Sequence, residues 1–184
     1  RAFRKHFSIH PTEVRKGYSL LSLPLLKPIT PEYIYQSDKL RNEPPELVER
    51  EESLLVGASF FVHNEDEVTD LSREWTLFLN EVHTIKNKTT PERFYQVQFW
   101  SDNQDLNGMY FFTGVEITKA ENINPLFVLK TIPAGKYLRF IHKGLANKVG
   151  YTYKYIYNQF LPNTEYKLNI PFNFEFYGEK CLGP

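Results

Sequence analysis

The chain has little of what several protein classes require. Its one cysteine, Cys181, cannot form a disulfide within the chain, which excludes a small disulfide-stapled fold and favours a reducing compartment. No apolar run approaches the roughly 18–20 residues that cross a bilayer, and the N-terminal residues do not have the pattern of a signal peptide. We therefore expect a cytoplasmic protein without a membrane partner.

The sequence also has no excess charge of either sign. Lys and Arg number 22 and Asp and Glu number 22, so the formal net charge is 0. A free-standing nucleic-acid-binding domain is usually basic, because it must contact phosphates. The balance argues against that class of protein.

The common catalytic motifs are missing as well. There is no G-x-S-x-G, no P-loop and no H-E-x-x-H, and the five histidines do not have metal-ligand spacing. Cys181 has no activating neighbour beyond Lys180, which argues against a reactive thiol. We expect no metal, no cofactor and no enzymatic activity.

Aromatic residues are abundant, with 15 Phe, 12 Tyr and 2 Trp. Phenylalanine fills cores, but a surplus of tyrosine often lines a pocket or an interface, because its ring is apolar and its hydroxyl is polar. The composition therefore directs attention to a ligand site rather than to a reaction centre.

The chain divides into three zones. Residues 1–16 are basic, with Phe3 and Phe7 spaced to share one helical face. Residues 17–45 contain five prolines and are interpreted as a connector with little regular structure. Residues 46–184 have regular hydrophobic patterns and form the predicted folded domain.

Within the third zone the pattern predicts two copies of a strand–helix–strand–strand unit. We expect strands at 48–50, 54–62, 94–100, 109–118, 127–132, 136–142 and 172–177, and helices at 68–82 and 146–161. The two helices start about 78 residues apart. The predicted class is α+β, with an antiparallel sheet, flanking helices and a cleft between pseudo-symmetric halves. The counterpart of strand 109–118 would lie beyond residue 184, so the last strand is expected to be missing.

Glu175 is the main candidate for ligand binding. Strand alternation in Phe174-Glu175-Phe176-Tyr177 sends Glu175 and Tyr177 to one face and the two Phe residues to the other. A carboxylate among aromatics is costly unless something cationic compensates it, and aromatic faces also attract cations. This combination suits a lipophilic cation. The alternative is a surface Glu on the solvated side of a strand.

Further aromatic residues are candidates for the same cleft. Trp100 and Tyr110 lie on consecutive strands, together with Phe112, for which core packing is favoured. Tyr153 and Tyr157 share a helical face, and a core position competes with a ligand role for both. Tyr137 alternates along its strand and is compatible with either face. The candidate ligand-binding residues are thus Glu175, Tyr177, Trp100, Tyr110, Tyr137, Tyr153 and Tyr157.

The N-terminal residues resemble the end of the helix-turn-helix domain of AraC-family transcription regulators. The resemblance rests on two segments, Phe3-Arg4-Lys5-His6-Phe7 and Pro11-Thr12-Glu13-Val14-Arg15, with Ser8 where that family usually has Gly. It covers about 16 residues, and the recognition helix itself is absent. The resemblance implies that the full-length helix-turn-helix domain binds DNA, but that this fragment does not bind it specifically.

Residues 46–184 resemble the GyrI-like, or bacterial effector-binding, domain. The resemblance rests on these segments: Phe112-Thr113-Gly114-Val115-Glu116-Ile117, Ile132-Pro133-Ala134-Gly135-Lys136-Tyr137, His142-Lys143-Gly144, Tyr153-x-x-Ile156-Tyr157-x-x-Phe160-Leu161-Pro162 and Phe174-Glu175-Phe176-Tyr177. It implies a ligand cleft between two halves, with the position of Glu175 meeting cationic drugs in multidrug-sensing members. Glu116 also matches a recurring family position, and we expect a structural role for it near the seam between the halves.

Two further functions remain open beside the leading hypothesis, which is an effector-sensing domain that binds a small aromatic or lipophilic cation. Some relatives of this scaffold hydrolyse strained electrophiles with a pocket Glu and Tyr, and gyrase-interacting relatives bind a protein. The AraC-type segment favours the sensor, because a stand-alone hydrolase has no need of it.

Overall fold

The structure is a computed structural model that describes residues 44–63, 71–100, 108–178 and 181. The predicted helix-turn-helix remnant, nearly all of the connector and the predicted loop 101–107 lie outside these residues. The strands are β1 (Glu46–Arg50), β2 (Ser53–His63), β3 (Phe94–Phe99), β4 (Gly108–Ile117), β5 (Val128–Ile132), β6 (Gly135–Arg139) and β7 (Phe172–Tyr177). The α-helices are α4 (Ser72–Glu81) and α5 (Val149–Tyr155).

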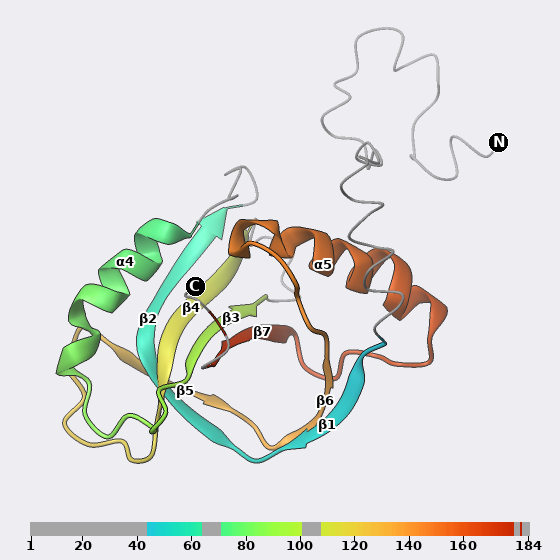
Figure 1. Cartoon of the computed structure of the whole chain (residues 1–184). Coiled ribbons are helices and arrows are strands. Elements are labelled where there is room, and N and C mark those ends of the chain that lie inside the picture. Colours follow the sequence, from blue (N-terminus) through green and yellow to red (C-terminus); the bar gives the residue numbers. More distant parts are fainter. Residues whose placement is uncertain (1–43, 64–70, 101–107, 179–180, 182–184) are drawn as a thin grey trace, which may run out of the picture.

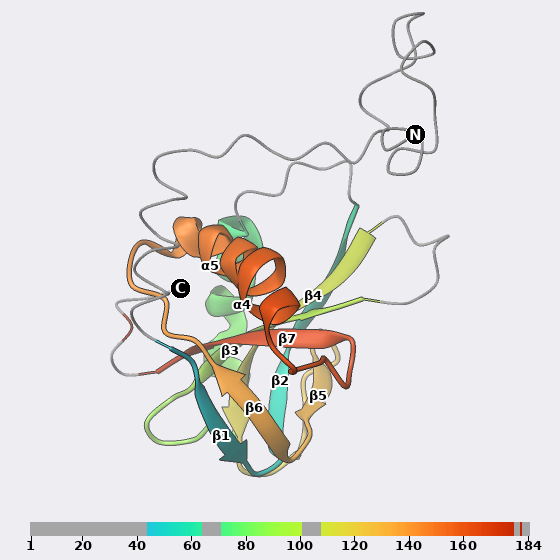
Figure 2. The same ribbon diagram turned by 90° about the vertical axis from the view of Figure 1, so that its right-hand side faces the viewer.

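Five strands form one antiparallel sheet in the order β5-β2-β4-β3-β7, and β1 and β6 form a separate two-stranded ribbon. Helices α4 and α5 lie on one face of the large sheet, and the ribbon curls beneath the other face (Figures 1 and 2). The predicted α+β class with an antiparallel sheet is confirmed.

Strand pairing shows the duplication directly. β1 pairs with β6 and β2 pairs with β5 in one continuous register, in which Arg50 opposes Gly135 and Ser53 opposes Ile132. β3 pairs with β7 along its whole length, from Phe94 opposite Tyr177 to Phe99 opposite Phe172. Exchanging β1, β2 and β3 for β5, β6 and β7 carries the β1–β6 pairing onto the β5–β2 pairing. The same exchange carries the β3–β7 pairing onto itself. The two halves therefore meet along the pairs that their symmetry relates.

One strand of the first half has no counterpart among the described residues. β4 pairs with both β2 and β3, whereas in the part of the chain that the structure describes β6 pairs only with β1 and β7 only with β3. Residues 182–184 lie outside that part, so the expectation of a missing last strand stays a prediction.

The large sheet is packed on both faces. On the helix side, Trp75 and Phe78 of α4 pack with a cluster that includes Val56 and Val115. On the ribbon side, Tyr95 and Phe112 are buried, together with a second cluster. Their neighbours in that second cluster are Leu55, Val97 and Ile132, with Phe99, Tyr137, Phe172 and Phe174 at its margin. Strand alternation thus supplies two cores, and Phe112 belongs to one of them.

The helices differ in detail from the sequence pattern. The described part of the first helix begins at Ser72 and continues as a 3-10 turn at Val82–Thr84. Trp75 and Phe78 are its buried residues, whereas Leu79 is 37% exposed. The second helix covers the expected range, but α5 passes into a π-helix at Ile156–Phe160 and then a 3-10 turn at Leu161–Asn163.

Candidate functional site

Glu175 lies on the helix side of the large sheet, as strand alternation predicts. Its neighbour across the ladder is Gln96 of β3, and Tyr177 lies on the same face of β7. Phe174 and Phe176 point to the opposite face, where both pack against Tyr95. One strand therefore carries a polar face toward the helices and an aromatic face toward the ribbon.

The carboxylate of Glu175 is surrounded by neutral hydrogen-bond donors. Oε1 accepts from Gln96 Nε2 at 3.0 Å, Gln98 Nε2 at 3.3 Å and the Tyr153 hydroxyl at 2.9 Å. Oε2 accepts from the hydroxyl of Tyr177. Among the residues that the structure describes, no Lys, Arg or His pairs with Glu175. Within the part of the chain that the structure describes, its negative charge is hydrogen-bonded but is not compensated by a cation.

Tyr153 and Tyr157 reach this carboxylate from the second helix. They lie one turn apart with stacked rings at 6.4 Å between centroids. The Tyr153 hydroxyl also lies 3.2 Å from Asn173 Oδ1, and Asn173 Nδ2 donates to the Tyr157 hydroxyl at 2.9 Å. The polar network thus ties the second helix to β7.

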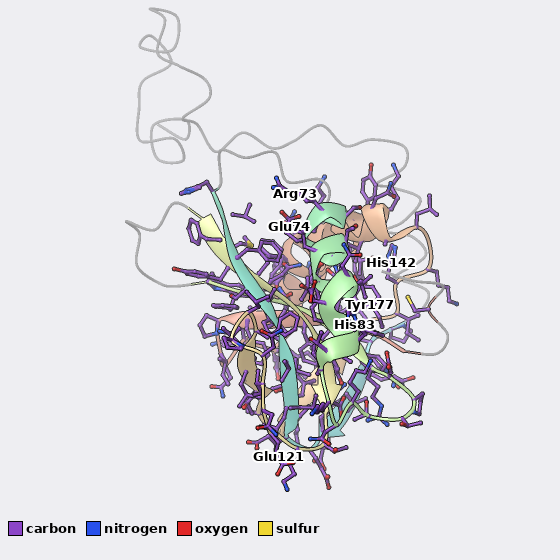
Figure 3. The ribbon with its side chains drawn as sticks, turned by 90° about the vertical axis from the view of Figure 1, so that its left-hand side faces the viewer. Arg73, Glu74, His83, Glu121, His142 and Tyr177 are labelled. Atoms are coloured by element: carbon purple, nitrogen blue, oxygen red, sulfur yellow. The ribbon has the colours of Figure 1, made fainter. Side chains whose placement is uncertain are left out.

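The first helix is tied to the same network through Trp75. The indole Nε1 donates to Gln96 Oε1 at 2.8 Å, and the Trp75 ring meets the Tyr177 ring edge-on at 5.4 Å. Figure 3 shows Tyr177 beside α4. Glu175 is therefore linked to both helices. Tyr153 of the second helix donates to it directly, and Trp75 of α4 is connected to it through Gln96.

The tyrosines of this network remain protonated donors at neutral pH. Burial raises the pKa of the Tyr153 hydroxyl well above its usual value, and the nearby negative charge of Glu175 raises it further. Burial and then Glu175 likewise raise the pKa of Tyr177. The pKa of Tyr157 is raised by burial, partly offset by the hydrogen bond from Asn173.

The structure brings together four of the seven predicted residues: Glu175, Tyr177, Tyr153 and Tyr157. Tyr137 lies on the ribbon side, where its hydroxyl donates to the Pro133 carbonyl at 2.7 Å and its ring packs against Phe174. Tyr110 stacks on Phe99 at 5.2 Å, and both belong to that same side. The face that each residue occupies follows from strand parity, so these two tyrosines are separated from Glu175 by the sheet itself.

Trp100 follows the last residue of β3, and its backbone N–H donates to the Pro171 carbonyl at 3.1 Å. A hollow in the described part of the chain is lined by Val56, Ile85 and Ile117 among others, and it includes none of the predicted site residues. The cleft at Glu175 and the ligand roles of the seven residues stay predictions.

Four residues of the network were missed from the sequence: Trp75, Gln96, Gln98 and Asn173. A signal for three of them was present, because Gln96 and Gln98 alternate with Tyr95 and Val97, and Asn173 alternates with Phe174. Amides at every second position mark a polar strip on an otherwise apolar strand. The contribution of Trp75 depends on how α4 docks, which alternation does not reveal.

A second buried polar cluster lies on the ribbon side. The Tyr95 hydroxyl donates to Glu116 Oε2 at 2.6 Å and accepts from Arg50 Nη2 at 2.8 Å, and Arg93 Nη1 donates to Glu116 Oε1 at 3.2 Å. Burial and the hydrogen bond to Glu116 raise the pKa of Tyr95 to about 12. The expected structural role of Glu116 stays a prediction.

The described residues contain no group of three or more potential metal ligands, and none of the described helices is long and apolar enough to span a membrane.

Two helices over an antiparallel sheet form the architecture of a GyrI-like effector-binding domain. Comparison with known proteins agrees with this class. The chain belongs to the Cass2 family, described as integron-associated effector binding protein, whose family model matches residues 46–182.

Two relatives place this family assignment in context. The chain is 25% identical over 146 residues to the transcriptional regulator BrlR of Pseudomonas aeruginosa, which covers 79% of this chain and 52% of BrlR. The chain thus spans about half the length of that regulator. The crystal structure of the integron cassette protein VCH_CASS2 from the mobile metagenome of Vibrio cholerae has the same fold, with a TM-score of 0.52 and 17% identity. That match covers 73% of this chain and 88% of the cassette protein.

Proposed function

We propose that the domain senses a small aromatic or lipophilic cation that binds at Glu175. The observation that supports this is the carboxylate itself, which accepts four neutral donors and has no cationic partner among the described residues. A negative charge in a partly buried aromatic setting favours a ligand that supplies the missing positive charge, and ring faces add cation–π attraction.

We propose further that ligand binding regulates transcription. The similarity to BrlR supports a regulator, and the spacing of Phe3, Phe7 and Pro11 supports an AraC-type DNA-binding domain before the connector. Ligand binding would then shift the population of DNA-bound states of the full-length regulator. Residues 1–184 alone are expected to bind DNA weakly and without sequence preference, because one basic segment cannot enter a major groove in register.

A thermal-unfolding screen tests the ligand proposal. A matched pair of probes is N-methylquinolinium, which is cationic, and 1-methylnaphthalene, which has the same shape without charge. A ligand that binds only the folded state raises the unfolding temperature, and at equal ligand concentration the tighter ligand raises it more. We expect the cation to raise it more than its uncharged isostere does. Equal effects of both probes, or no effect of either, would remove the support for a charge-selective site.

We also propose that the domain is not an enzyme. Glu175 and Tyr153 form a carboxylate–phenol pair, which is the pair that a hydrolase on this scaffold would use. Incubation with a simple epoxide, with product followed by chromatography, separates the two functions. Turnover that is lost in Glu175→Gln would make the protein a hydrolase.

A further inference from the structure

The amide of Gln96 is held in one orientation by its surroundings. Gln96 is only 6% exposed, and its Oε1 accepts from Trp75 Nε1 at 2.8 Å. An indole N–H can only donate, so the oxygen end of the amide must face Trp75. The NH₂ end is consequently directed at Glu175 Oε1, at 3.0 Å. Gln96 cannot exchange its ends without placing two donors against each other.

Gln98 is a natural comparison on the same strand. Its Nε2 also donates to Glu175 Oε1, at the longer distance of 3.3 Å. Its amide oxygen has no bond to a donor-only side chain such as Trp75 among the hydrogen bonds of the described residues. Gln96 and Gln98 thus both donate through Nε2 to Glu175 Oε1. Among the described residues, only the Gln96 amide is also held in one orientation by a hydrogen bond from Trp75.

The two oxygens of Glu175 are unequally occupied. Oε1 receives Gln96, Gln98 and Tyr153, while Oε2 receives Tyr177 as its one donor among the described residues. A carboxylate oxygen offers about two lone-pair positions, so Oε1 is saturated and Oε2 retains acceptor capacity. The side of the carboxylate toward Tyr177 is therefore the side on which a further positive group can bind.

We propose that Gln96, locked by Trp75, is a positioning residue that determines the charge selectivity of the site. It holds Oε1 toward β3 and thereby presents Oε2 to the cationic group of the ligand, next to the edge-on rings of Tyr177 and Trp75. This inference rests on the proposed cation site and adds the residue that orients it and the oxygen that meets the ligand.

The experiment compares Gln96→Met with Gln98→Met in the full 184-residue chain. Each change removes one donor from Oε1 and keeps an unbranched side chain of similar size, but only the first releases Trp75. Affinities for N-methylquinolinium and 1-methylnaphthalene are measured by ligand-observed NMR. We expect Gln96→Met to weaken cation binding about tenfold and Gln98→Met about threefold or less, with the uncharged probe unchanged in both.

Trp75→Phe provides a second route, because Gln96→Met leaves a buried indole N–H without its acceptor. The phenyl ring keeps an aromatic contact with Tyr177, while Gln96 remains present but is no longer locked. We expect weaker cation binding in Trp75→Phe. When Gln96→Met is added to it, the total loss should be smaller than the sum of the two single losses, since both changes remove the same restraint on Gln96.

Each outcome decides the inference. Equal losses in the two Gln variants, or additive losses in the double variant, would overturn the positioning role and leave the proposed function standing. Equal loss of both probes in Gln96→Met and in Trp75→Phe would show structural damage and would also overturn it. No cation binding by the wild-type protein would overturn the proposed function, and this inference with it.

Discussion

Replacing Glu175 with Gln removes the charge of the site while keeping its shape. The amide oxygen can take the place of Oε1 and accept from Gln96, Gln98 and Tyr153, and the amide NH₂ can donate to the Tyr177 oxygen. The network therefore keeps its contacts, but it loses charge assistance and the Tyr177 hydroxyl loses the acceptor for its own proton. We expect the variant to fold, with a modest loss of stability.

The effect on a cationic ligand should be much larger. N-methylquinolinium has no N–H, so it would meet Glu175 through charge alone. Two unit charges about 4 Å apart interact by about 1–4 kcal/mol between bulk water and a protein surface, so its affinity should fall roughly ten- to hundredfold in Glu175→Gln. Binding of 1-methylnaphthalene rests on contact area and should change little. Tryptophan fluorescence is a suitable assay, because Trp75 lies 5.4 Å from the Tyr177 ring and is one of two tryptophans in the chain.

Two results would refute this reasoning. Equal loss of both ligands would mean that the substitution damages the fold rather than the charge. No loss of either ligand would mean that Glu175 is a strand residue whose donors serve structure alone.

Three further perturbations test the networks around this strand. Tyr153→Phe removes a donor from Glu175 and should lower the free energy of unfolding by about 1–2 kcal/mol in urea denaturation; a change below measurement error would show that water replaces the hydroxyl. Arg50→Lys should lower the free energy of unfolding by about 1–2 kcal/mol, because the flat guanidinium lies 5.2–5.7 Å from three ring centroids. Its control, Arg139→Lys in an exposed ion pair, should lower it by no more than about 0.5 kcal/mol. Stability should fall as pH rises from about 10 to 12, by at most about 1.4 kcal/mol per pH unit from Tyr95, since its folded pKa of about 12 keeps the proton that the unfolded chain releases. Tyr95→Phe should make that fall shallower, and an unchanged slope would contradict the assignment.

Much of the fold could be predicted because period-two alternation and repeat spacing are local signals. The seven strands lie within a few residues of their expected positions, and the parity of Phe174 and Glu175 placed them on the correct faces. The π-helical turn at Ile156–Phe160 could not be predicted, because the hydrophobic spacing indicates a helix but does not tell an i→i+4 from an i→i+5 hydrogen-bond pattern.

The site was predicted only in part for a related reason. Alternation shows which residues of one strand share a face of the sheet. It does not show which residues of a distant strand lie on that same face. Tyr110 and Tyr137 were grouped with Glu175 on composition, and their strands direct them to the ribbon side instead. Trp75 lies within the helix expected at 68–82, and its hydrogen bond to Gln96 appears only when that helix lies on the sheet.

The two faces of β7 place opposite demands on six consecutive residues. A single insertion or deletion within Phe172–Tyr177 would turn the Phe residues toward the helices and Glu175 toward the ring cluster around Arg50. Such a shift would break both networks at once, whereas a substitution breaks only one. In a comprehensive mutational scan, this strand should tolerate many replacements at the half-exposed Phe176 but length changes at none of its positions. Variation among natural versions of the domain is expected to follow the same rule, with divergence entering through side chains and not through the length of this strand.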